Sequence, residues 1–112
     1  MIRVDHVICL AIEEIEAWLL GDEDAIVAAY PQAKLPVLHS YIQDSICGTW
    51  ETLADVVYKG GQQIMRKQHY SERGRIKDEW AKKIGAHLDL SHNQSPSFNA
   101  FLSEIYKRAD AA

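Results

Sequence analysis

The beginning of the chain carries a run of branched and apolar residues that predicts a β-strand. Arg3 to Ile12 reads Arg-Val-Asp-His-Val-Ile-Cys-Leu-Ala-Ile, and the second half of this run is continuously apolar. Such a run is typical of a strand covered on both faces, as in the middle of a sheet. No second strand candidate follows in the sequence, so we expect this strand to pair between chains.

After Ile12 the apolar positions change to the three-to-four-residue spacing of an amphipathic helix. Residues 13–20 carry two such stripes, and Gly21 ends the segment as a C-terminal glycine does. Asp22 suits the N-cap of a second helix over 23–30, because its carboxylate can accept the free amide hydrogens of the first turn. Pro31 closes that helix.

The rest of the chain predicts a succession of helices separated by Gly and Pro. Short helices are expected over 37–43 and 49–58, with a further turn or two over 62–68. A longer helix over 76–88 carries a buried stripe at four-residue spacing: Ile76, Trp80, Ile84 and Leu88. Ser95 and Pro96 give an N-cap and first-turn pair for a last helix over 97–108. Its apolar residues are expected to face the core: Phe98, Phe101, Leu102, Ile105 and Tyr106. The predicted fold is mainly α with one N-terminal β-strand, a single domain of residues 1–112 with about five to six helices.

The composition is that of an ordinary globular protein. Of 112 residues, 47% are hydrophobic and 25% are charged, which argues against a disordered chain. The uncharged run from His6 to Ile12 is far shorter than the roughly 20 apolar residues that span a bilayer, and acidic residues bracket it. We therefore expect a cytoplasmic protein with no membrane partner. Cys9 and Cys47 sit in apolar surroundings without metal-ligand spacing, so buried reduced thiols are expected.

The formal charge changes sign along the chain. Residues 1–65 carry a net −7, whereas residues 66–83 carry +4. The basic group consists of Arg66, Lys67, Arg73, Arg75 and Lys77, with His69 and Tyr70 between them. If functional, this group would contact the phosphates of a nucleic acid and bind it in a salt-dependent way. The alternative is a solvated helix face of mixed charge, which a local excess of this size favours.

Three segments together resemble a known family. Residues 11–22 read Ala-Ile-Glu-Glu-Ile-Glu-Ala-Trp-Leu-Leu-Gly-Asp, residues 80–89 read Trp-Ala-Lys-Lys-Ile-Gly-Ala-His-Leu-Asp, and residues 95–105 read Ser-Pro-Ser-Phe-Asn-Ala-Phe-Leu-Ser-Glu-Ile. They resemble the C-terminal half of an uncharacterised prokaryotic family related to the TOPRIM domain of OLD-type nucleases. The first segment is the specific one, since that family has a strand followed by a helix with approximately the pattern Glu-x-Glu-Ala-Trp-Leu-Leu-x-Asp. The resemblance covers nearly all of the chain and is weakest over 32–68.

The resemblance implies a metal site of which these residues would form only a part. A TOPRIM-like site binds a divalent metal through a glutamate and an Asp-x-Asp pair, and both belong to an N-terminal half that the three segments do not match. Glu13 and Glu16 lie three residues apart on the predicted helix and would add carboxylate oxygens for Mg²⁺. The alternative is that these glutamates complement the helix dipole. Asp22 and Asp24 repeat the Asp-x-Asp spacing, but helix capping is the role we expect for them.

Two functions are consistent with these observations. No Ser/His/Asp or Cys/His arrangement and no Gly-rich phosphate loop can be assigned, so the catalytic residues are unknown. We expect a non-catalytic interaction module or subunit, acting as a homodimer or bound to a separately encoded N-terminal half. The alternative is a Mg²⁺-dependent, TOPRIM-like nuclease or nucleic-acid-processing component that requires that half.

Overall fold

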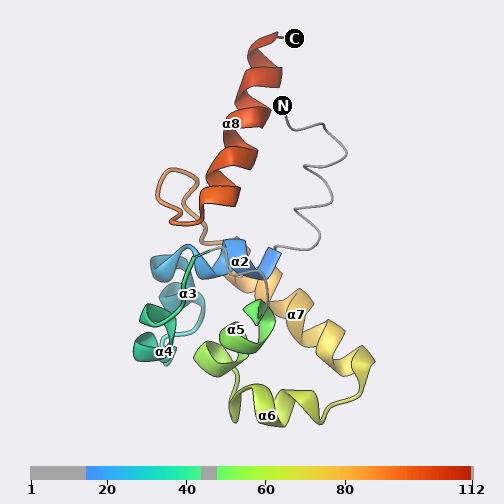
Figure 1. Ribbon diagram of the computed structural model, residues 1–112. Helices are drawn as coiled ribbons and strands as arrows, with labels where there is room; N and C mark the ends of the chain where they lie inside the picture. Colours follow the sequence, from blue (N-terminus) through green and yellow to red (C-terminus); the bar gives the residue numbers. More distant parts are fainter. Residues whose placement is uncertain (1–14, 44–47, 112) are drawn as a thin grey trace.

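The computed structural model describes residues 15–43 and 48–111, which fold into seven α-helices with no strand among them (Figure 1). In chain order these are α2 (Ile15–Leu20), α3 (Glu23–Ala29), α4 (Leu35–His39), α5 (Thr49–Val57), α6 (Gly61–Arg66), α7 (Tyr70–Gly85) and α8 (Pro96–Ala111). This part of the chain is mainly helical, as predicted, with one helix more than the expected five to six. The predicted strand from Arg3 to Ile12, together with Glu13 and Cys47, lies outside the described residues.

Helices α2 to α7 pack into one body, and α8 rises from it (Figure 1). The main core of the body combines side chains from all the helices from α2 to α7; the largest fully buried ones are Trp80, Leu20, Ile26, Leu53, Met65, Ile84 and Val56. A second, smaller cluster joins Ala17 and Trp18 of α2 to Phe98 of α8. Within the two described ranges, none of the helices combines the length and the hydrophobicity that a membrane crossing requires.

The turn between α2 and α3 shows why residues 21 and 22 are Gly and Asp. A Cβ on Gly21 would lie 2.0 Å from Oδ1 of Asn93, so the glycine permits a close approach rather than a left-handed turn. Asp22 caps α3 as predicted, because its Oδ1 accepts the Ala25 N–H at 3.0 Å. Its Oδ2 accepts the Asp89 N–H at 2.8 Å, which fastens the loop after α7 to the start of α3.

Two helices begin earlier than their apolar residues predict. The helix expected over 37–43 is α4, which starts at Leu35 because Pro36 fits the first turn, where no N–H is needed. The helix expected over 76–88 is α7, which starts at Tyr70 and ends at Gly85. Leu88 is therefore not helical, although it still packs against both clusters.

The loop between α7 and α8 is held by polar side chains. The Asn93 side-chain N–H donates to the Trp18 carbonyl at 2.9 Å, and the Gln94 N–H donates to the Gly21 carbonyl at 2.8 Å. Ser95 then caps α8 as predicted, since its Oγ accepts the Phe98 N–H at 3.2 Å. These bonds fix the place at which α8 leaves the body.

Candidate functional site

Helix α8 carries an apolar face that the body covers only at its base. Phe98 is 5% exposed, whereas Ile105 is 42% and Tyr106 55% exposed. The prediction that Ile105 and Tyr106 face the core is therefore wrong. The physical reason is that the small cluster around Trp18 extends only as far as Phe101 and Leu102, which are half-buried. We call Phe101, Leu102, Ile105 and Tyr106 the α8 face.

Trp18 joins the α8 face to the body. Its ring meets Phe98 edge-on at 5.4 Å between centroids and lies 4.9 Å from the ring of Phe101. Its Nε1–H donates to Oγ of Ser97 at 2.8 Å. Ile15, 42% exposed, lies one turn before Trp18 on the same side of α2. Trp18 thus links the base of α8 to α2.

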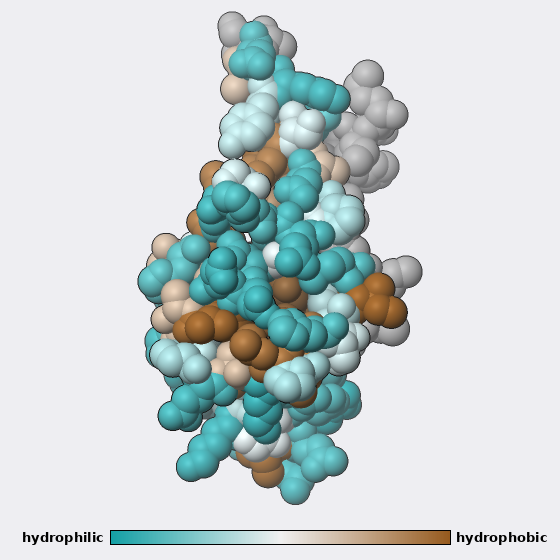
Figure 2. Space-filling view, turned by 90° about the vertical axis from the view of Figure 1, so that its left-hand side faces the viewer, coloured by the Kyte–Doolittle hydropathy of each residue, from teal (hydrophilic) through white to brown (hydrophobic). Residues whose placement is uncertain are grey.

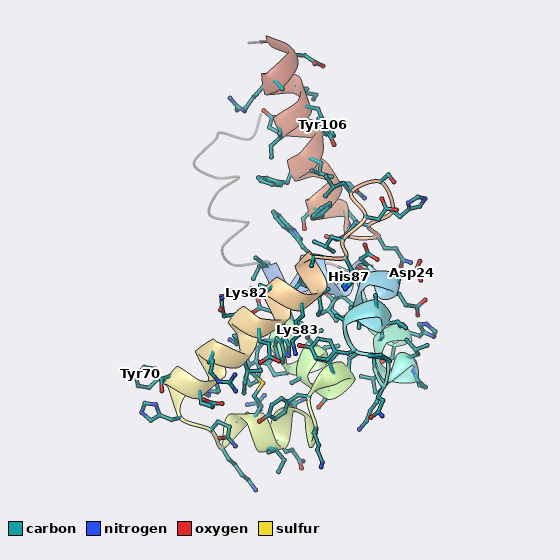
Figure 3. All side chains as sticks on the ribbon, turned by 180° about the vertical axis from the view of Figure 1, so that it is seen from behind. Asp24, Tyr70, Lys82, Lys83, His87 and Tyr106 are labelled. Carbon is teal, nitrogen blue, oxygen red and sulfur yellow. The ribbon has the colours of Figure 1, made fainter. Side chains whose placement is uncertain are left out.

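Charged residues of α8 lie beside the α8 face rather than on it. Helical spacing places Ala109 on the same side as Ile105 and Lys107 on the opposite side. Arg108 pairs with Glu104 at 3.1 Å. In the side view of Figure 2, hydrophobic surface shows at the lower part of the column formed by α8, among hydrophilic residues. Tyr106 lies on the upper part of α8, away from the body (Figure 3).

The predicted metal pair is described only in part. Glu16 lies in the first turn of α2 and is half-buried, whereas Glu13 lies outside the described residues. Among residues 15–43 and 48–111, no three His, Cys, Asp or Glu side chains gather in a way that could hold a metal ion. Those residues alone do not make a Mg²⁺ site, and Glu16 would need ligands from outside them.

The structure divides the predicted basic group. Arg66 at the end of α6 and Lys77 on α7 both lie over the ring of Trp50, at 5.4 and 5.0 Å from its centroid. Arg75 instead bonds Glu72 at 2.6 Å and Glu79 at 3.3 Å, and these bonds raise the pKa of Arg75 and neutralise its charge locally. Lys67 is exposed and Arg73 half-buried. Trp50 is the residue that the charge pattern could not reveal, since it lies 16 residues before Arg66 in the sequence.

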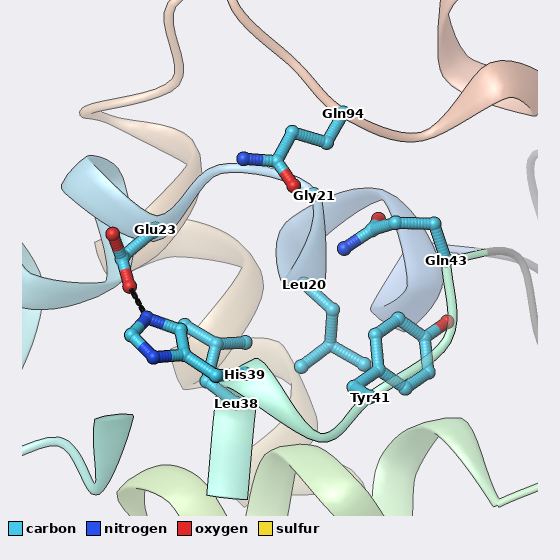
Figure 4. Close-up of a pocket in the computed structure, with 8 residues that line it drawn as sticks. All are labelled: Leu20, Gly21, Glu23, Leu38, His39, Tyr41, Gln43 and Gln94. Carbon is cyan, nitrogen blue, oxygen red and sulfur yellow. Dashed lines mark hydrogen bonds and ion pairs between the residues drawn. The ribbon is translucent and has the colours of Figure 1, made fainter. Parts of the chain in front are cut away.

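Figure 4 shows a small pocket between α2, α4 and the residues that follow α4, with a volume of about 300 Å³. Leu20 and Leu38 form its apolar side, and Gln43 and Gln94 bring amide groups to it. Oε1 of Gln43 is buried and accepts no hydrogen bond from the residues described. At the rim, His39 pairs with Glu23. The lining offers hydrogen-bonding groups and one ion pair, so it suits a small polar molecule.

Comparisons of the chain with protein-family models, with curated proteins and with solved structures found no match.

Proposed function

We propose that this chain is an interaction module that associates with a second copy of itself through the α8 face. The exposure of Ile105 and Tyr106, on a helix that stands away from the body, is the observation that carries the proposal. Contiguous apolar side chains left to water on a helix are a mark of an interaction site.

A second copy suits the α8 face because the face is self-complementary. Leu102, Ile105 and Ala109 follow the three-to-four-residue spacing with which two helices interlock side by side. In a two-fold symmetric dimer each α8 would present the same row to the other, antiparallel to it. The charged residues from 104 to 110 are two acidic and two basic, so two copies would not repel each other.

The expected affinity is modest. Full burial of an Ile or aromatic side chain is worth about 1.5–3 kcal/mol, and a symmetric dimer would cover Ile105 and Tyr106 from both copies. Association costs about 4–15 kcal/mol in lost freedom. The gain is of the same order as the cost, so we expect weak association, with a dissociation constant no tighter than micromolar.

The test compares two tyrosines at opposite ends of the molecule (Figure 3). Tyr106→Glu places a charge in the proposed interface, and sedimentation velocity should show the dimer become a monomer. Tyr70, 73% exposed at the start of α7, provides the matched control, and Tyr70→Glu should remain dimeric. Equal sedimentation of the two variants would refute the proposed interface, provided that circular dichroism shows the same helix content.

Nucleic-acid processing is the second candidate function, and the placement of Arg66 and Lys77 over Trp50 supports it. A ring flanked by cations suits stacking on a base next to a phosphate. The TOPRIM-like resemblance would add Glu13 and Glu16 as ligands of Mg²⁺ in an assembly that includes an N-terminal half. Replacing Arg66 and Lys77 by Gln should weaken DNA binding at low salt, and unchanged binding, measured by fluorescence anisotropy, would reject this candidate.

A further inference from the structure

A cationic hollow lies on another part of the body, between the end of α3, the end of α5 and the side of α7. Its volume is about 630 Å³, within the range of small-molecule sites. Three lysines line it: Lys34, Lys59 and Lys83. No Asp or Glu is among the described residues of the lining, although the chain as a whole is acidic.

Two tyrosines line the hollow. Tyr30 and Tyr58 are both half-buried and line it together with Val56 and Val57. The Lys83 ammonium lies 5.7 Å from the centroid of the Tyr30 ring. Burial and the nearby Glu79 raise the pKa of Tyr30 while Lys83 opposes them, so the phenol stays neutral at physiological pH.

The backbone around the hollow is held by hydrogen bonds. The Lys34 N–H donates to the Val56 carbonyl at 2.9 Å, which ties the segment after α3 to α5. On the other side, Gly60 has a φ of +92°, and a Cβ there would lie 2.5 Å from Cγ1 of Ile64. Glycine at this position keeps the turn beside Lys59 tight, so the lysines are carried by a defined backbone.

The three lysines differ in their ion pairs. Lys83 forms an ion pair with Glu79 at 2.9 Å, and each charge partly compensates the other. Lys34 and Lys59 are exposed and form no ion pair with any residue the structure describes. Their charges are therefore available to an anion in the hollow.

We propose that this hollow binds a nucleotide, whose phosphate would lie between Lys34 and Lys59 and whose base would lie against Tyr30. Lysines recognise a phosphate as point charges, and an aromatic ring accepts the flat face of any base. The nucleotide could be free or part of a single strand. A second hollow of about 760 Å³ shares Lys34 and Gly60 with the first and extends to Arg66, which gives a strand room to continue.

The experiment measures binding of AMP, adenosine, inorganic phosphate and a labelled single-stranded oligonucleotide by calorimetry and anisotropy. We expect AMP to bind more tightly than adenosine or phosphate alone, because it uses both the lysines and the ring. A strand that binds more tightly than AMP, at the same residues, identifies single-stranded nucleic acid as the source of the nucleotide.

The variants test the site itself. Replacing Lys34 and Lys59 by Gln should weaken AMP or strand binding about tenfold, whereas replacing Lys82 and Lys107 by Gln removes the same charge elsewhere and should leave it unchanged. Lys82 and Lys83 point to different sides of α7 (Figure 3). The proposal would be overturned if adenosine bound with the same affinity as AMP, or if neither AMP nor the strand bound. Equal losses of binding in the two double variants would also overturn it. The Tyr106→Glu monomer should still bind, which separates this result from the proposed dimer.

Discussion

At the scale of single residues, Asp22 accepts hydrogen bonds from two different parts of the fold. One carboxylate oxygen caps α3 and the other holds the Asp89 N–H, and the side chain is 4% exposed. The N-cap could be predicted from the sequence because it depends on local spacing. The bond to residue 89 could not, because it joins positions 67 residues apart that only the packing of α7 brings together.

Asp22→Ala should lower the free energy of unfolding by about 2–3 kcal/mol, since it removes the cap and leaves the Asp89 N–H without its acceptor. Asp24, an exposed acidic residue in the first turn of the same helix, provides the control. Asp24→Ala should cost about 0.3–1 kcal/mol through the helix dipole alone. Urea unfolding measures both, and similar losses for the two variants would contradict the double role of Asp22.

Asp89 makes the stability of the fold depend on pH in the acid range. Hydrogen bonds from Ser91 and His92 lower the pKa of Asp89 from 3.8 to about 2. A pKa lowered in the folded state contributes stability that is present above the ordinary pKa and is lost as the pH falls to about 2. Asp89→Asn should therefore flatten the pH dependence of unfolding between pH 4 and 2, measured by circular dichroism in urea. Parallel curves for the variant and the natural protein would show that these bonds contribute nothing.

At the scale of elements, α7 shows what apolar spacing misses. Its first six residues, 70–75, carry no apolar side chain other than Tyr70 and give no buried stripe. They are helical because the Ser71 N–H donates to the His69 ring at 3.2 Å and Arg75 bridges Glu72 and Glu79. The buried stripe of Ile76, Trp80 and Ile84 was predicted correctly, so the sequence revealed the packed part of the helix and not its exposed beginning.

Gly74→Ala tests that exposed beginning. Gly74 lies inside α7, and a Cβ there would meet nothing within 4 Å. The substitution should raise the free energy of unfolding by about 0.5–1 kcal/mol, because alanine is the better helix residue. Gly60→Ala should instead destabilise the fold, since it strains a positive φ. A neutral or destabilising Gly74→Ala would indicate that residues 70–75 are not helical.

At the scale of the whole molecule, the helical class and most helix positions could be predicted, but the surfaces could not. Apolar spacing located Phe98, Leu102 and Ile105 on one side of α8 without showing that the body covers Phe98 and ends before Ile105. Likewise, Lys34 and Lys59 are isolated cations in an acidic part of the sequence, and only the fold brings them to one hollow with Lys83. The neighbouring elements determine which part of a helix is covered, so the covered part cannot be predicted from the sequence of the helix alone.

The most direct measurement is the molar mass of the unmodified chain by sedimentation equilibrium at concentrations from the micromolar to several hundred micromolar. If the α8 face binds its counterpart in a second copy, the mass should rise from that of one chain to that of two as the concentration increases. A mass that stays at one chain up to several hundred micromolar would contradict the association proposed for Ile105 and Tyr106.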